Sequence, residues 1–140
     1  MVNMAKVLLI DDDTVLLKLY STKLTSDGHQ VQVAVNGEDG LKLVSSFTPD
    51  IILLDLLMPK INGFAFLEEL NLQPATQAIP KIVFSSVANQ EQVKRLQTLG
   101  VTLFLNKIDT TPTQLVNVIN QVLNLPNPKP NPPPNVQTSR

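Results

Sequence analysis

Five short apolar runs constrain the fold of this chain more than any other feature of its sequence. Each is rich in Val, Ile and Leu, and most are apolar throughout instead of alternating with polar residues. A parallel strand that helices cover on both faces needs such continuous apolarity. The runs span residues 7–10, 31–35, 51–54, 82–84 and 101–105. We therefore expect a sheet of five strands, most of them covered by helices on both faces.

The segments between these runs have helical length and helical period. Leu17, Tyr20 and Leu24 recur at steps of three and four residues, which is the spacing of one helix face. Thr111 and Gln114 form a capping box, which predicts that the last helix begins there. These segments are therefore expected to be amphipathic helices that pack on the sheet.

Alternating strands and helices favour a doubly wound α/β fold, because parallel neighbours need a crossover and a helix supplies it. We expect a five-stranded parallel sheet in the flavodoxin-like order 2-1-3-4-5, with helices on both faces. In such a sheet ligands bind beyond the carboxyl ends of strands 1 and 3. The residues that follow those strands are therefore the first candidates for a site.

Length and composition predict one domain and exclude several classes of function. The 140 residues are 43% apolar and 16% charged, which suits a single soluble globular core. A net charge of −1 without a Lys/Arg cluster argues against direct nucleic-acid binding. Cysteine is absent, which excludes thiolate metal sites and thiol nucleophiles. No apolar run is long enough to span a bilayer and no signal peptide precedes the first strand, so we expect no membrane association and a cytoplasmic location.

The last part of the chain differs from the rest in composition. Residues 126–140 are rich in Pro and Asn, and prolines cannot donate backbone hydrogen bonds. We expect one domain over residues 1–125, followed by a Pro/Asn-rich disordered tail or linker over residues 126–140.

Polar side chains follow four of the five apolar runs. They are Asp11, Asp12 and Asp13 after the first run, Asp55 after the third, Ser85 and Ser86 after the fourth, and Lys107 after the fifth. Because parallel strands end at the same edge, these groups should converge on one cleft. The aspartates would bring about three negative charges together there, against one positive charge from the lysine. Oxygen-only ligation by carboxylates points to Mg2+, and Mn2+ fits the same ligands.

Each of these residues also has an ordinary structural explanation. Asp12 and Asp13 suit the N-cap of a helix. Ser85 suits a satisfied hydroxyl at a strand end, and Lys107 suits a solvated surface charge. None of these explanations accounts for Asp55, which closes a buried strand ahead of a Met-Pro turn. We therefore interpret the set as one functional cleft.

Four short motifs lie in order along nearly the whole chain before the tail. They are Leu-Leu-Ile-Asp11-Asp12-Asp13, Leu-Leu-Asp55-Leu-Leu-Met58-Pro59 with Gly63, Phe84-Ser85-Ser86, and Phe104-Leu-Asn-Lys107. This arrangement resembles the receiver domains of two-component response regulators and is chemotaxis-regulator-like. The resemblance runs from about Ala5 to Leu125.

The resemblance implies a metal site. By position, Asp11 and Asp12 would hold Mg2+, partly through water, and Asp55 would ligate the same ion. The backbone carbonyl of Leu57 would be a further ligand.

The resemblance also implies a phosphorylation-dependent switch. Asp55 would accept a phosphoryl group from the phosphohistidine of a histidine kinase or phosphotransfer protein. Lys107 would neutralise the phosphoryl oxygens and Ser85 would bond to one of them, while Phe104 would turn inward as the switch residue. A partner would then read the surface formed by helix 4, strand 5 and helix 5, and homodimers on activation are common in the family. Such a chain is a phosphoacceptor that assists its own phosphorylation and dephosphorylation, and not an enzyme acting on other substrates.

One departure and two alternatives qualify the resemblance. Ile108 follows Lys107 where the family usually has proline, so we expect a trans bond and a differently shaped loop. The run Asp11-Asp12-Asp13-Thr14-Val15 also resembles the nucleophile motif of haloacid-dehalogenase-like phosphatases, although that reading gives Asp55 no role. The second alternative is a degenerate receiver that acts as a phosphorylation-independent interaction module. The sequence identifies neither the kinase, the downstream partner nor the oligomeric state.

Overall fold

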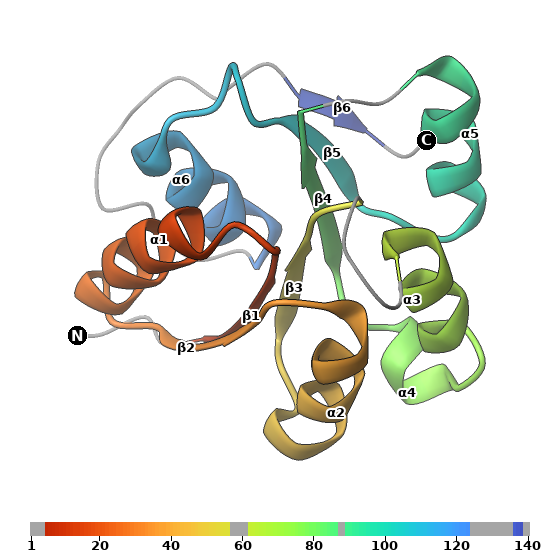
Figure 1. Ribbon diagram of the computed structural model, residues 1–140, viewed down its shortest axis with the longest axis horizontal. Coiled ribbons are helices and arrows are strands. Elements are labelled where there is room, and N and C mark those ends of the chain that lie inside the picture. Colours follow the sequence, from red (N-terminus) through yellow and green to blue (C-terminus); the bar gives the residue numbers. More distant parts are fainter. Residues whose placement is uncertain (1–4, 57–61, 87–88, 124–135, 139–140) are drawn as a thin grey trace.

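A parallel sheet forms the centre of the molecule (Figure 1). The computed structural model describes residues 5–56, 62–86, 89–123 and 136–138. Its sheet order is β2-β1-β3-β4-β5-β6, and the first five strands are parallel. The strands are β1 (Lys6–Ile10), β2 (Gln30–Ala34), β3 (Ile51–Leu54), β4 (Lys81–Ser85), β5 (Leu103–Asn106) and β6 (Val136–Thr138). The predicted parallel order 2-1-3-4-5 is confirmed.

Helices cover both faces of the sheet (Figure 1). On one face lie α1 (Thr14–Ser26) and α6 (Pro112–Val122); on the other lie α2 (Gly37–Phe47), α3 (Gly63–Leu70) and α5 (Gln90–Thr98). A short additional helix, α4 (Pro74–Gln77), precedes β4. The helices predicted as the fourth and fifth of the fold are therefore α5 and α6. None of the helices in the described part of the chain is long and apolar enough to cross a membrane.

Alternation along the strands produces two separate cores. Val7 and Leu9 of β1 face the core beneath α1 and α6, whereas Leu8 and Ile10 face the core beneath α2 and α3. All four side chains are almost fully buried. A strand that faces apolar surroundings on both sides must be apolar at every position, which is the pattern the sequence shows.

Side-chain caps set where the helices begin. The carboxylate of Asp13 accepts hydrogen bonds from the backbone of the first turn of α1. Thr111 and Gln114 form the predicted capping box at the start of α6, and Asn89 with Gln92 forms a second one at α5. Because these caps lie in the loops that leave the strands, they also orient the carboxyl edge of the sheet.

A sixth strand lies outside β5 and runs antiparallel to it. It consists of Val136–Thr138, within the segment that the sequence predicts as a disordered tail or linker. For these three residues the structure shows a strand instead, because the outer edge of β5 offers free backbone groups for pairing. The rest of the predicted tail lies outside the described residues.

Lys81 is a fully buried cation at the start of β4. Its Nζ donates hydrogen bonds to the carbonyl oxygen of Gln77, the last residue of α4, at 2.8 Å and to that of Ile79 at 2.7 Å. Burial lowers the pKa of Lys81 to about 8. This side chain therefore anchors the α4 turn against the strand that carries Ser85.

The lowered pKa of Lys81 predicts a pH-dependent stability. Between about pH 8 and the ordinary lysine pKa of 10.5 the unfolded chain holds this proton more firmly than the folded one. The free energy of unfolding of wild type relative to Lys81→Met should therefore rise by about 2 kcal/mol from about pH 8 to about pH 10. Urea denaturation at several pH values measures this difference. Lys18→Met, at an exposed position of α1, is the control and should show no such rise; a pH-independent difference for Lys81→Met would contradict the expectation.

Candidate functional site

The register of β1 and β3 brings two aspartates together. Ile10 is paired with Leu54, so the next residues, Asp11 and Asp55, leave the sheet side by side. The backbone N–H of Asp55 donates to the carbonyl of Ile10 at 2.9 Å, and that of Asp11 donates to Ala34 at 3.1 Å. Both carboxylates are thus held at the carboxyl edge by backbone bonds on neighbouring strands.

Three carboxylates form an acidic cluster at this edge, which comprises Asp11, Asp12 and Asp55. One oxygen from each lies within 4.8 Å of the others. Asp11 and Asp55 are buried, each 7% exposed, whereas Asp12 is exposed. Carboxylates this close repel one another unless a cation lies among them. The predicted convergence of these three residues is confirmed, and their oxygen atoms suit a hard divalent cation.

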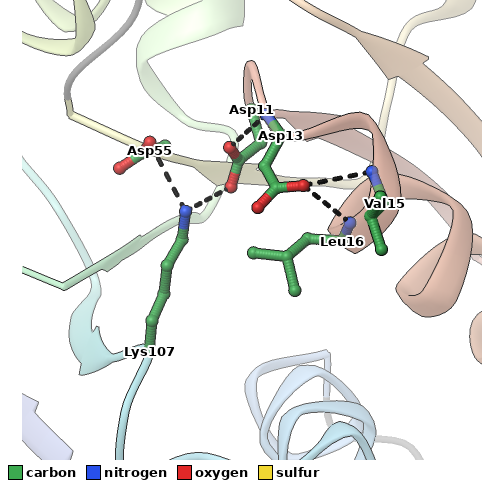
Figure 2. A network of polar contacts seen from close by, with 6 residues as sticks. All are labelled: Asp11, Asp13, Val15, Leu16, Asp55 and Lys107. Carbon is green, nitrogen blue, oxygen red and sulfur yellow. Dashed lines mark hydrogen bonds and ion pairs between the residues drawn. The ribbon is translucent and has the colours of Figure 1, made fainter.

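Lys107 reaches the acidic cluster from the end of β5 (Figure 2). Its Nζ lies 2.6 Å from Asp11 Oδ2 and 3.4 Å from Asp55 Oδ2. The ammonium also lies 5.9 Å from the ring centre of Phe84, a neighbour that the sequence analysis did not identify. The predicted approach of this lysine to the aspartates is therefore present in the structure.

Burial and charge act in opposite directions on the pKa values of this ion pair. Burial lowers the pKa of Lys107, but the hydrogen bond and charge of Asp11 and the charge of Asp55 outweigh it, so the net pKa is raised. Burial also raises the pKa of Asp11, and Lys107 offsets only part of this effect. The lysine is thus firmly protonated, and it is the main positive group that compensates the two buried carboxylates.

Asp13 has a structural role and not a place in the acidic cluster. Its Oδ1 accepts hydrogen bonds from the backbone of Val15 at 3.1 Å and Leu16 at 3.2 Å (Figure 2). Its own N–H donates to Asp11 Oδ1 at 2.9 Å. The helix-capping explanation therefore holds for Asp13, whereas Asp12 belongs to the acidic cluster. Through its N–H, the capping residue also orients Asp11.

Hydrogen bonds from Asn106 hold the loop after β5, in which isoleucine and not proline follows Lys107. The Lys107–Ile108 peptide bond is trans, as expected, and the Ile108 side chain is 80% exposed. Asn106 holds the turn: its Oδ1 accepts from Ile108 N–H at 2.8 Å, and its carbonyl accepts from the Thr110 hydroxyl at 2.9 Å. The N–H of Lys107 donates to the Ser85 carbonyl at 3.1 Å. Asn106 was missed from the sequence, although an asparagine at a strand end is a recognised turn signal.

The remaining predicted residues lie on β4 and β5 or outside the described part. Ser85 is the last residue of β4, is 1% exposed and is paired with Asn106 of β5. Phe104 is paired with Val83 and is half-buried. An open groove of about 510 Å³ lies between α5 and β5, beside Phe104 and Asn106. Leu57, whose carbonyl was predicted as a metal ligand, lies outside the described residues.

Gly63 packs directly against the backbone that carries Asp55. A Cβ at this position would lie 2.8 Å from Leu56 Cα and 2.9 Å from the Asp55 carbonyl oxygen. The N–H of Gly63 also donates to the Leu56 carbonyl at 2.9 Å. Backbone atoms cannot move aside as a flexible side chain can, so only glycine fits between α3 and the end of β3.

This contact predicts an unequal effect of two alanine substitutions. Gly63→Ala should lower the free energy of unfolding by about 1–3 kcal/mol, because it forces backbone apart next to Asp55. Gly40→Ala is the matched control: its new methyl meets Ile10 Cδ1 at 2.7 Å and the Phe66 ring at 3.1 Å, which are side-chain and not backbone atoms, and alanine favours the helix. Urea denaturation of both variants measures the difference. A loss for Gly40→Ala as large as that for Gly63→Ala would refute the explanation.

Comparison with known proteins assigns the family. Residues 7–120 match the response regulator receiver domain family. The chain is similar to protein PilH of Pseudomonas aeruginosa, with 33% identity over 120 residues that cover 86% of this chain and 98% of PilH. It is also similar to response regulator PleD of Caulobacter vibrioides, with 32% identity over 74% of this chain but 23% of PleD.

The fold has similar solved relatives. The structure of chemotaxis protein CheY4 of Vibrio cholerae superposes with a TM-score of 0.79 at 27% identity, covering 85% of this chain and 98% of that one. The flavodoxin-like architecture and the four motifs thus agree with the family match. The chain belongs to the receiver domains of two-component response regulators, whose general function is phosphorylation-dependent switching.

Proposed function

We propose that Asp55 accepts a phosphoryl group and that the chain acts as a phosphorylation-dependent signalling switch. The observation that carries the proposal is that Asp55 belongs to the acidic cluster and also lies 3.4 Å from the Lys107 ammonium. A phosphoryl group attached there would meet a cation on one side and a protonated amine on the other. Both stabilise negative charge on a transferring phosphoryl group.

The contacts of the two buried aspartates favour Asp55 over Asp11 as the acceptor. Asp11 uses both of its oxygens: Oδ1 accepts from Asp13 N–H at 2.9 Å, and Oδ2 pairs with Lys107 at 2.6 Å. Asp55 Oδ2 makes a longer contact with Lys107, at 3.4 Å. An oxygen that is less tightly hydrogen-bonded is the better nucleophile, because fewer contacts must be lost before it attacks.

We propose that the acidic cluster holds Mg2+, with Mn2+ as a substitute. Asp11, Asp12 and Asp55 supply oxygen atoms close enough to share one ion, and the family generally binds Mg2+ in such a pocket. The backbone carbonyl of Leu57 would complete the protein ligands. When bound, the cation would neutralise the carboxylates and the phosphoryl oxygens.

The donor in this proposal is a phosphohistidine of a histidine kinase or phosphotransfer protein. The bond between phosphorus and the imidazole nitrogen breaks as an Asp55 oxygen forms its bond to phosphorus, and the electron pair stays on the nitrogen. Lys107 would neutralise the oxygens of the transferred group, and the Ser85 hydroxyl would donate to one of them. Receiver domains interact with such kinases and with downstream effectors.

The phosphorylated state would be read at the surface formed by α5, β5 and α6. Ser85 and Phe104 lie on adjacent strands that lead to this surface, and the groove beside Phe104 leaves room for its side chain to move. A shift of both residues would bias an existing equilibrium between two surface shapes. A downstream protein or a second copy of the chain would bind one of them.

Two alternative functions can be distinguished from this proposal by experiment. The family match argues against a haloacid-dehalogenase-like phosphatase, which would leave Asp55 without a role. A degenerate receiver would keep the fold but would not be phosphorylated.

Asp55→Asn should keep the fold and lose phosphorylation, because the amide has nearly the same shape but is a poor nucleophile. Incubation with acetyl phosphate and Mg2+, followed by intact mass, should show one added phosphate on wild type and none on the variant. Asp109→Asn, at an exposed position of the loop after β5, is the control and should label normally. A wild type that never gains phosphate under these conditions would support the degenerate alternative.

Metal binding should depend on Asp12 although this residue is exposed. Asp12→Asn should weaken Mg2+ binding about tenfold or more, because it removes one charged ligand from the acidic cluster. The fold should be unaffected, since the side chain is outside both cores. A titration followed by NMR or calorimetry measures the affinity, with Asp109→Asn again as control. Equal affinity in wild type and Asp12→Asn would show that the ion binds elsewhere.

A further inference from the structure

The outer edge of β5 is occupied by the chain itself. β6 pairs antiparallel with β5, and Leu103, Phe104 and Leu105 lie opposite Thr138, Gln137 and Val136. Figure 1 shows β6 beside β5, on the side away from β4. Without β6, β5 would expose a row of unpaired N–H and C=O groups, which is a template for any extended strand.

The same strand leads directly into the candidate site. Its last residue, Asn106, is paired with Ser85, and the next residue is Lys107, whose ammonium contacts Asp11 and Asp55. β5 therefore carries β6 along one edge and the lysine of the site at its end. A shift of β5 would therefore change both its pairing with β6 and the position of Lys107 in the site.

β5 has more freedom to shift than the strand beside it. Three of its four residues are only half-buried, whereas every residue of β4 is buried. The groove of about 510 Å³ lies along its α5 side. Along the edge of β5 that faces away from β4, three residue pairs hold β6. Three residue pairs barely offset the conformational entropy that the β6 segment loses when it docks. A small change in the position of β5 can therefore release β6.

We propose that β6 is an intramolecular mask of the β5 edge, docked in the unphosphorylated state and released when Asp55 is phosphorylated. The inference rests on the proposed function of Asp55. In the present arrangement Lys107 is drawn to Asp11 at 2.6 Å. A phosphoryl group on Asp55 adds negative charge that competes for this ammonium, and the pull acts on the residue next to β5. The β5 position that suits β6 is then no longer the favoured one, and the edge becomes available to an extended strand of a partner.

By thermodynamic linkage, the coupling between β6 docking and phosphorylation must act in both directions, which makes the proposal testable. If phosphorylation weakens the docking of β6, then undocking β6 must strengthen the binding of a phosphoryl analogue, up to a limit set by the docked fraction in wild type. Gln137→Pro removes the central N–H of β6 and disfavours a strand, while it leaves every residue of the candidate site in place. Gln137→Ala is the matched control, because it keeps the backbone N–H.

The experiment compares the wild-type chain of 140 residues with these two variants in Mg2+ buffer. Beryllofluoride, an analogue of the phosphoryl group, is titrated and followed by NMR, and amide hydrogen exchange of β5 is measured with and without it. Gln137→Pro should bind beryllofluoride about twofold more tightly than wild type and Gln137→Ala, because a marginal ladder leaves docked and undocked forms about equally populated in wild type. The β5 amides should exchange faster in Gln137→Pro and, on adding beryllofluoride, in wild type.

Each contrary result has a separate meaning. Unchanged β5 exchange in Gln137→Pro would show that β6 does not protect this edge, and would overturn the inference. Faster exchange with unchanged affinity for beryllofluoride would show a docked strand that is not coupled to the site, and would overturn it as well. If no variant bound beryllofluoride, the proposed function would fail and the inference with it; the exchange data would still report docking, so the two failures are distinguishable.

Discussion

The ion pair between Lys107 and Asp11 connects the outermost parallel strand to the centre of the sheet. It crosses the ends of β3 and β4, so it ties together strands that share no direct hydrogen bonds. It also supplies positive charge to two buried carboxylates that would otherwise repel each other. Asn106 and Ser85 fix the backbone from which the lysine extends. The geometry of the site therefore depends on β5 as much as on the strands that carry the aspartates.

Two of the three carboxylates of the acidic cluster follow strands that are almost fully buried. Asp11 and Asp55 follow strands whose side chains are buried on both faces, and Gly63 brings α3 against the backbone of Asp55. The strands at the two ends of the parallel sheet, β2 and β5, are less buried. The two buried carboxylates therefore follow deeply buried strands, whereas the lysine that contacts them follows a less buried one.

The sequence predicted those features that depend on local pattern and on the register of parallel strands. Continuous apolarity revealed the inner strands, and the residues after them, Asp11 and Asp55, converged because neighbouring strands end together. β6 was not predicted, because a strand of three residues is too short to show a periodic pattern and the proline-rich sequence before it indicates disorder. The close contact of Gly63 and the burial of Lys81 depend on distances between elements, which no local pattern records.

The sixth strand also changes where the structural unit ends. The family match stops at residue 120, near the end of α6, whereas the sheet continues to Thr138. A boundary drawn from sequence similarity would therefore separate β5 from the segment that completes its edge. A fragment that ends at residue 120 would keep the same aspartates but would lack the strand that pairs with the outer edge of β5.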